Sequence, residues 1–245
     1  MSKVTVITGG TSGIGRGIAE KILANSEEGD TLYISYGHNQ QQAEQFYASL
    51  SSEKQKMVVL VQADMSAYEE MMAFAGRIKE EAGQVDWLIN NVGISTYEKY
   101  EDYTFEEWSR IVNTNLSVPV FLVKELRPVM KEGGSILFTG SYAGVQAYSS
   151  SLVYGVTKAA IHFLTKSLVK ELEPKAVRVN AIAPGFIETS WHKNRTPESY
   201  ERINRKIALH RFGEISEVAD MAYEILKNGY MNGSIVDIHG GYDYF

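Results

Sequence analysis

Short runs of Val, Ile and Leu alternate along the whole chain with longer stretches in which apolar residues recur every three or four positions. The short runs have no polar face, which is typical of strands buried on both sides of a parallel sheet. The longer stretches have the period of helices that pack on such a sheet. Seven strands are predicted, at residues 4–8, 31–36, 57–62, 85–93, 136–139, 178–183 and 234–238. The pattern therefore predicts the α/β class: a single doubly wound Rossmann domain over residues 1–245, with a seven-stranded parallel sheet and helices on both faces.

Polar residues mark the expected starts of several helices. Ser66 and Thr104 each have a glutamate three residues later, which is the spacing of a capping box. Ser216 is expected to cap the last helix, and a further helix is expected over residues 39–51.

Residues 188–214 have no strand pattern, and aromatic and basic side chains gather there. These side chains are Trp191, His192, Lys193, Arg195 and Arg211. We expect a substrate lid around 188–214, because loops on a rigid scaffold commonly supply binding residues. A surface loop without that role is the alternative.

Charge and composition narrow the classes of partner. The chain has 245 residues, with 24 basic and 30 acidic side chains and a net charge of −6, and no stretch is notably basic. A nucleic-acid or anionic-membrane partner therefore has no electrostatic support. The absence of cysteine excludes disulfides and thiolate catalysis, and the five histidines lack metal-ligand spacing, so no metal is expected. The first residues form a strand rather than a signal peptide, and no run has the length of a membrane span, so a cytoplasmic protein is expected.

A glycine-rich loop at residues 9–15 joins the first strand to the first helix. Glycines let the backbone turn tightly and approach a pyrophosphate, whose charge then lies on the unpaired N–H groups of the helix. Methyltransferases use similar loops, but the position in the first strand-to-helix turn favours a dinucleotide.

Three further residues suggest carbonyl chemistry. Tyr154 and Lys158 are four residues apart in a helical pattern and so share one helix face. A free phenol has a pKa of about 10, and a nearby ammonium would favour the phenolate. Tyrosine and lysine at this spacing are also common on exposed helices. Ser141 favours the catalytic interpretation of this pair. It follows the apolar run 136–139, at the sheet edge where α/β proteins bind ligands.

Together these motifs resemble the short-chain dehydrogenase/reductase family. The family's Tyr-x-x-x-Lys is matched by Tyr154 and Lys158, with Ser141 thirteen residues before the tyrosine. Its Thr-Gly-x-x-x-Gly-x-Gly loop begins at Thr8, and its Asn-Asn-Ala-Gly motif is present with Val92 in place of the alanine.

The resemblance implies four catalytic residues: Asn115, Ser141, Tyr154 and Lys158. Tyr154 would donate a proton to the carbonyl oxygen, and Ser141 would hydrogen-bond that oxygen. Lys158 would hold the nicotinamide ribose and lower the pKa of the phenol. Asn115 occupies the position of the family's fourth catalytic residue.

The resemblance also implies the cofactor contacts. These residues are Gly9, Thr11, Ser12, Gly13, Ile14, Gly15, Tyr36, Gly37, His38, Asp64, Met65, Asn91, Gly93, Tyr154, Lys158, Pro184, Gly185, Ile187 and Thr189. A 2′-hydroxyl is normally held by an acid about twenty residues after the glycine loop, and residues 31–43 contain none. NADP is therefore favoured, while NAD stays possible because no basic residue occupies the family's 2′-phosphate positions.

Among relatives, the closing motifs resemble β-ketoacyl-acyl-carrier-protein reductases, so reduction of a 3-oxoacyl group on acyl carrier protein is one expected reaction. A sugar, polyol or small-ketone reductase is the alternative. A nucleotide-sensing protein without turnover is an alternative from another class. Arg127, Lys131 and Lys170 are the basic residues that an acidic carrier could contact, although a solvated basic face is the simpler explanation.

A homotetramer is the assembly that the resemblance implies. The aromatic ending at residues 242–245 would suit burial at a subunit contact, or folding back over the site of its own subunit.

Pro119 predicts a disturbed helix next to the site. A proline has no N–H to donate to the carbonyl four residues before it, which is that of Asn115. In relatives that carbonyl holds a water of a proton relay, so Pro119 either exposes such a relay or bends the helix for packing alone.

Overall fold

The computed structural model describes residues 2–148 and 151–242. Within these residues, seven parallel strands form one sheet in the order β3-β2-β1-β4-β5-β6-β7. The strands are β1 (Val4–Ile7), β2 (Thr31–Tyr36), β3 (Val58–Gln62), β4 (Val85–Asn90), β5 (Met130–Thr139), β6 (Arg178–Pro184) and β7 (Ile235–Ile238). The order reverses direction between β1 and β4, and a doubly wound sheet binds its ligand at such a point. The predicted fold class is confirmed.

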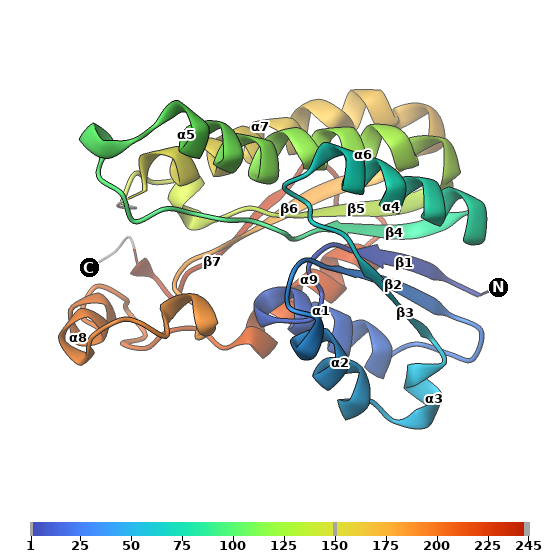
Figure 1. Ribbon diagram of the computed structural model, residues 1–245, viewed down its shortest axis with the longest axis horizontal. Helices are drawn as coiled ribbons and strands as arrows, with labels where there is room; N and C mark the ends of the chain where they lie inside the picture. Colours follow the sequence, from blue (N-terminus) through green and yellow to red (C-terminus); the bar gives the residue numbers. More distant parts are fainter. Residues whose placement is uncertain (1, 149–150, 243–245) are drawn as a thin grey trace.

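Helices cover both faces of the sheet (Figure 1). One face carries α1 (Gly13–Ala24), α2 (Gln40–Ser49), α3 (Ser52–Gln55) and α9 (Ile215–Lys227). The other carries α4 (Tyr68–Glu81), α5 (Phe105–Val112), α6 (Val118–Leu126) and α7 (Leu152–Leu172). The helix α8 (Pro197–Asn204) lies away from these layers (Figure 1). Short 3-10 turns are η1 (Tyr100–Asp102), η3 (Arg127–Val129), η4 (Tyr142–Gly144), η5 (Glu173–Lys175) and η6 (Ser190–His192), and η2 (Asn113–Ser117) is a π turn.

The apolar strand runs lack a polar face because each side of the sheet faces a core. Along β5, Ile136 and Phe138 belong to the core beneath α4, α6 and α7, whereas Leu137 belongs to the core beneath α1 and α9. All three side chains are buried. Burying each of them contributes about 1.5–3 kcal/mol relative to exposure.

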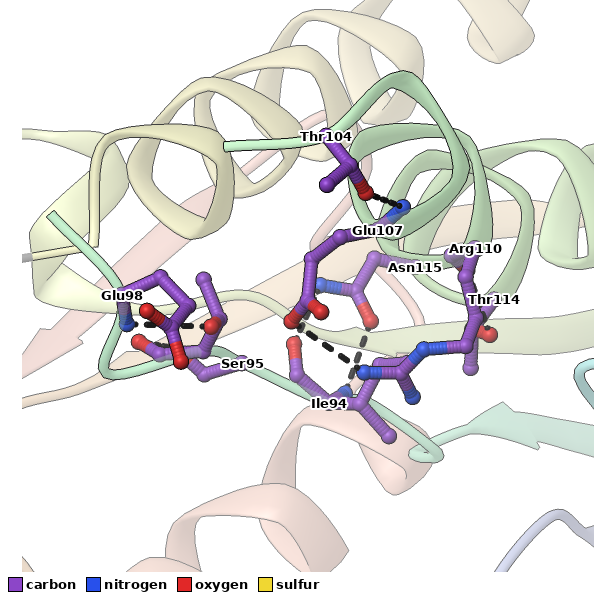
Figure 2. A network of polar contacts seen from close by, with 9 residues as sticks. Ile94, Ser95, Glu98, Thr104, Glu107, Arg110, Thr114 and Asn115 are labelled. Atoms are coloured by element: carbon purple, nitrogen blue, oxygen red, sulfur yellow. Dashed lines mark hydrogen bonds and ion pairs between the residues drawn. The ribbon is translucent and has the colours of Figure 1, made fainter. Parts of the chain in front are cut away.

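Of the three predicted helix caps, Thr104 is confirmed, and Ser66 and Ser216 are wrong. Thr104 does cap α5, accepting a hydrogen bond from the Glu107 N–H at 3.1 Å, but the Glu107 carboxylate pairs with Arg110 instead of completing the box (Figure 2). The Ser66 prediction was wrong, because α4 begins after Ala67, which makes no side-chain cap.

The Ser216 prediction was also wrong. The residue before α9 is Glu214, which forms a reciprocal capping box with Glu217. A glutamate is a less common cap than serine. Arg211 holds the Glu217 carboxylate through two N–H bonds of 2.6 and 2.8 Å, which supports the box two residues earlier than expected.

One strand begins earlier than predicted. β5 begins at Met130 rather than at residue 136, and its pairing with β4 shifts between Val85 and Trp87. The polar and glycine residues 131–134 hid this part of the strand. The helix expected over 39–51 is present as α2, which Asn39 caps, and Ser51 caps the separate short helix α3 after it.

Pro119 follows a π turn, as its missing N–H predicted. The π turn joins α5 to α6, and the N–H of Val118 bonds to the Asn113 carbonyl five residues before it. Wider turns of this kind leave room where an ordinary helical bond is missing. The water expected on the Asn115 carbonyl stays a prediction.

No helix among the described residues combines the length and the apolar character that a membrane crossing needs. Most of the aromatic ending lies outside the described residues, at 243–245. Tyr242 is described, and its ring lies 4.8 Å from that of Tyr148 and 5.4 Å from that of Phe186.

The turn η4 packs unusually closely on α7. A Cβ on Gly144 would lie 2.5 Å from the carbonyl carbon of Lys158 and 2.6 Å from the Ala159 nitrogen. Both atoms belong to the backbone of a long helix, so neither can easily move. The glycine therefore sets the distance between the segment that carries Ser141 and the helix that carries Lys158.

We expect Gly144→Ala to lower the free energy of unfolding by about 1–3 kcal/mol, since the added methyl must push η4 away from α7. Gly76→Ala is the matched control, because a Cβ at that position in α4 has nothing within 4 Å. That control should stabilise the protein by roughly 0.5–1 kcal/mol. Urea unfolding measures both, and an unchanged midpoint in Gly144→Ala would show that the close approach is not a constraint.

Candidate active site

A cavity of about 390 Å³ opens at the carboxyl ends of the strands. Its walls come from the loops after β1, β4, β5 and β6 and from the first turns of α7. The predicted site residues that line it are Gly9, Ser12, Gly13, Ile14, Gly15, Asn91, Gly93, Ser141, Tyr154, Lys158, Pro184, Gly185, Ile187 and Thr189. Segments distant in the sequence thus meet in one place.

The glycine loop leaves no room for side chains. Gly9 has a φ of +65°, and a Cβ there would lie 2.8 Å from a methyl of Val92. A Cβ on Gly15 would collide with the Gly9 carbonyl and the Asn91 side chain. α1 begins at Gly13, and its first N–H groups have no partner within the helix. The bare backbone and these donors fit the pyrophosphate of a dinucleotide.

Asn91 ties three loops together. Its Nδ2 donates to the carbonyls of Thr8 and Gly9 at 3.1 and 3.2 Å, and its Oδ1 accepts from the Thr139 hydroxyl at 3.2 Å. The loops after β1, β4 and β5 are therefore fixed relative to one another at the cavity.

Lys158 is buried, with 3% of its surface exposed, and its Nζ donates to the Thr139 carbonyl at 2.7 Å. Burial lowers the pKa of this ammonium to about 8. The Nζ lies 5.6 Å from the centroid of the Tyr154 ring, so the two residues share one helix face as predicted.

Burial raises the pKa of the Tyr154 phenol, and a hydrogen bond with Ser141 opposes this effect only in part. Burial is thus the largest influence on this pKa, and the lowering by Lys158 that the resemblance implies stays a prediction. A phenolate is costly in a dry environment, and the Lys158 ammonium donates to the Thr139 carbonyl. Tyr154 is thus a protonated donor at neutral pH.

Ser141 is held through its backbone and its side chain. Its N–H donates to Nε2 of His162 at 3.4 Å, and its Oγ accepts from the Ala143 N–H at 3.1 Å. Burial, with the charges of Lys158 and Lys166, lowers the pKa of His162 to about 4, so the ring stays neutral and can accept.

Asn115 lies behind the cavity rather than in its wall. Its Oδ1 accepts from the Ile94 N–H at 2.8 Å, and its Nδ2 donates to the Ile94 carbonyl at 2.9 Å and to the Thr157 hydroxyl at 3.0 Å. Figure 2 shows the contact with Ile94. The side chain joins the loop after β4 to α7, one residue before Lys158.

Some predicted cofactor residues lie outside the cavity wall. They are Thr11, Tyr36, Gly37, His38, Asp64 and Met65. Met65 is part of a core, with 3% of its surface exposed. His38 and Asp64 meet beyond the ends of β2 and β3, where Nε2 of the histidine lies 3.1 Å from a carboxylate oxygen.

Sequence reasoning missed an aromatic wall. Tyr97, Tyr148, Phe186, Trp191, His192 and Arg195 line the cavity. The composition of residues 188–214 indicated the last three, but Tyr148 belongs to no periodic pattern. His192 accepts from Nε of Arg195 at 3.1 Å, and burial, with the arginine charge, lowers its pKa to about 4.

The basic residues considered for carrier binding lie at the edge of the sheet where the strands begin, opposite the cavity. Lys131, at the start of β5, pairs with Asp86 at 2.7 Å. Lys175 donates to the carbonyls of Pro128 and Met130, so the C-terminal end of α7, which carries Lys170, also lies at that edge. Arg127 immediately precedes this region. In this chain they do not surround the mouth of the cavity.

Comparison with known proteins places the chain among oxidoreductases. A family model described as enoyl-(acyl carrier protein) reductase matches residues 9–243. An uncharacterized oxidoreductase, YmfI of Bacillus subtilis, is 30% identical over 246 residues, covering 99% of each chain. The 3-oxoacyl-acyl-carrier-protein reductase FabG of Aquifex aeolicus is 31% identical over 98% of this chain and 96% of its own. A short chain dehydrogenase from Burkholderia cenocepacia in complex with NADP has the same fold, with a TM-score of 0.89, 24% identity and coverage of 99% and 98%.

Proposed function

The chain belongs to the short-chain dehydrogenase/reductase family of oxidoreductases, and from this premise we propose that it transfers hydride between NADP(H) and a carbonyl or alcohol substrate. The observation that carries the proposal is the meeting of Ser141, Tyr154 and Lys158 with the glycine loop in one cavity.

Each residue has a distinct role in this proposal. The loop 9–15 holds the pyrophosphate, and a bound nicotinamide supplies or accepts the hydride. Tyr154 gives its proton to the carbonyl oxygen, or takes it from the alcohol. Ser141 hydrogen-bonds that oxygen, and Lys158 binds the ribose. Asn115 does not line the cavity and acts by positioning α7.

The cofactor proposal rests on the end of β2. Residues 31–43 contain no acid to hold a 2′-hydroxyl, and the Burkholderia protein of the same fold binds NADP. His38 is a candidate for contact with a 2′-phosphate, since its side chain is 86% exposed and lies beyond the end of β2.

A 3-oxoacyl group on acyl carrier protein is the substrate suggested by the FabG relatives at about 30% identity. The position of Arg127, Lys131 and Lys170, away from the cavity mouth, does not help to bring a carrier to this site. A sugar, polyol or small ketone is the alternative substrate. Assays of ketoacyl, sugar and steroid substrates by nicotinamide absorbance separate these classes.

We also propose that the whole chain is one cytoplasmic domain, with residues 188–214 as a lid. Support for the lid comes from Trp191, whose ring lies 5.9 Å from that of Tyr154, and from Arg195 in the cavity wall. A lid of this kind keeps water from the reacting carbonyl.

Turnover should be lost in Tyr154→Phe, because only the transferable proton is removed. General acid–base groups contribute about 10²–10⁴ in rate, so a loss of at least that size is expected, with NADPH binding unchanged. Lys158→Met should weaken both turnover and cofactor binding. Nicotinamide absorbance and fluorescence titration measure the two quantities.

Tyr230→Phe is the matched control, because this phenol is 99% exposed and lies far along the chain from the site. Near-normal turnover in Tyr154→Phe would sink the assignment. Cofactor binding by a wild-type protein that reduces no substrate would instead favour the nucleotide-sensing alternative.

We expect the wild type to use NADPH about tenfold better than NADH, in kcat/KM, since one hydrogen bond to the 2′-phosphate is worth roughly that factor. His38→Asp should reverse the preference by repelling a 2′-phosphate. Fluorescence titration with each reduced cofactor provides a readout independent of turnover. A clear NADH preference in the wild type would contradict this prediction.

A homotetramer is the assembly that we propose. α5 and α7 expose large apolar side chains, among them Phe105 at 79% and Phe163 at 74%. Such side chains on neighbouring helices suit a subunit contact. Light scattering at micromolar concentration should therefore show a species several times larger than the 27.4 kDa chain, and a 27.4 kDa species alone would exclude the assembly.

A further inference from the structure

Arg195 is a cation in the cavity wall that forms no ion pair with any residue in the described part of the chain. Its Nε donates to Nδ1 of His192 at 3.1 Å, and its Nη1 donates to the Ser199 hydroxyl at 3.2 Å. Its guanidinium also lies 5.5 Å from the centre of the Phe186 ring. The serine and the phenylalanine are neutral, and so is the histidine above a pH of about 4, which is its pKa. The charge of Arg195 is therefore not balanced by the side chains that it contacts.

The other arginines of the described residues have a charge partner, a helix end or solvent. Those that pair with a glutamate are Arg16, Arg77, Arg110 and Arg211. Arg178 donates to carbonyls at the end of α9. The exposed arginines are Arg127, Arg202 and Arg205. Arg195, which is half-buried, has none of these means of balancing its charge.

The Arg195 side chain is held in place before any ligand binds. His192, which accepts from it, is 9% exposed, and its ring lies 5.9 Å from that of Phe186 and 5.2 Å from that of Phe212. A ligand of the guanidinium would therefore lose less free energy in ordering this long side chain than it would at a free surface.

The guanidinium keeps donors for a ligand. An arginine has five N–H groups, and His192 and Ser199 use two of them, which leaves three. The planar arrangement of these donors fits the two oxygens of a carboxylate. A single guanidinium balances the single negative charge of such a group.

The cavity wall contains no competing acid. Among the described residues that line it there is no aspartate or glutamate, and Lys158 and Arg195 are its cations. Lys158 already donates to the Thr139 carbonyl and is assigned to the nicotinamide ribose. A carboxylate in the cavity would therefore meet no like charge from the wall, and Arg195 is the cation left to bind it.

The nearest acids of the lid lie elsewhere. The Glu188 carboxylate accepts from the Tyr200 hydroxyl at 2.9 Å. Glu201 lines a second hollow, to which Arg195 also contributes, and forms no ion pair with the arginine among the described residues.

Arg195 belongs to the aromatic wall rather than to the pyrophosphate loop. The chain after β6 first approaches that loop, since a Cβ on Gly13 would lie 3.9 Å from a Thr189 methyl. It then returns, because Arg195 lies over Phe186, whose ring is 5.5 Å from that of Tyr148. This wall is on the side of the cavity formed by the segments after β5 and β6.

We propose that Arg195 is a specificity-determining residue that binds a carboxylate of the substrate, so that the substrate is a short oxo acid. This proposal rests on the proposed function and names the substrate class of the same site. The carboxylate takes no part in the reaction. Hydride adds to the carbonyl carbon, the Tyr154 proton goes to the carbonyl oxygen, and the product is the corresponding hydroxy acid. A short acid is favoured because the cavity of about 390 Å³ must also admit the nicotinamide.

The first experiment compares each oxo acid with its own methyl ester, which keeps the carbonyl and removes the charge. The series consists of 3-oxobutanoate, 4-oxopentanoate and 5-oxohexanoate. For the best acid of the series, kcat/KM should exceed that of its ester by about tenfold or more, the ordinary worth of a hydrogen bond to a charged group.

The Arg195→Met variant should lose this preference. Its kcat/KM for the acid should fall by about tenfold or more, mainly through KM, while the ester is little affected and the dissociation constant of NADPH is unchanged. Arg195→Lys, which keeps a charge without the planar donors, should retain part of the preference.

Arg202→Met is the matched control. Arg202 comes from the same lid and donates to the same Ser199 hydroxyl, at 3.5 Å, but it is exposed and does not line the cavity. This variant should keep the wild-type preference for the acid.

The second experiment needs no turnover. Calorimetry measures the binding of hexanoate and of hexanamide, which have no ketone, to the NADP⁺ complex. The wild type and Arg202→Met should bind hexanoate about tenfold or more tightly than hexanamide, and Arg195→Met should bind the two equally.

The outcomes separate the two proposals. Equal binding of hexanoate and hexanamide by the wild type overturns the carboxylate site, and so does an equal loss for acid and ester in Arg195→Met. A loss of NADPH affinity in Arg195→Met as large as the loss for the acid assigns the arginine to the cofactor and also overturns it. Hexanoate binding that depends on Arg195, in a protein that turns over no carbonyl, supports the site and counts against the proposed reaction instead.

Discussion

The active site depends on one buried contact, the hydrogen bond from the Lys158 ammonium to the Thr139 carbonyl at 2.7 Å. Burying an ammonium costs free energy, and the fall of its pKa to about 8 reflects this cost. The contact joins the end of β5 to the first turns of α7 and holds the amine at the cavity. Gly144 lets η4 approach the same turn of the helix, so Ser141 and Lys158 are fixed by backbone contacts rather than by flexible side chains.

Two asparagines extend this framework. Asn91 joins the loops after β1, β4 and β5, and Asn115 joins the loop after β4 to α7 beside Lys158. Each amide uses both its donor and acceptor atoms, so the polar residues that resemble family motifs are also the ties between strand ends. Replacing either amide side chain would therefore disturb the geometry of the site.

The strands were predictable because a buried parallel strand must be apolar on both faces, as Ile136, Leu137 and Phe138 show. Caps were less predictable. Ser66 and Ser216 have the right residue type, but Ala67 and Glu214 precede the helices, since interactions of Glu70 and Arg211 with neighbouring segments decided where each helix starts. The start of β5 was missed because Met130 pairs with Val85 ahead of an irregularity in the register, where the polar and glycine residues 131–134 give no strand pattern.

The sequence by itself determined the fold class, the glycine loop and the spacing of Tyr154 and Lys158, because these features follow from periodicity and from residues close together in the chain. Only the tertiary structure decided that the Tyr154 phenol has a raised pKa, since burial depends on what covers the ring. It also decided that Tyr148 belongs to the cavity wall, because the rings of Phe186 and Tyr242 pack against it from other segments. Contacts between distant segments leave no local pattern, and the protonation states and hydrogen-bond directions of this site depend on such contacts.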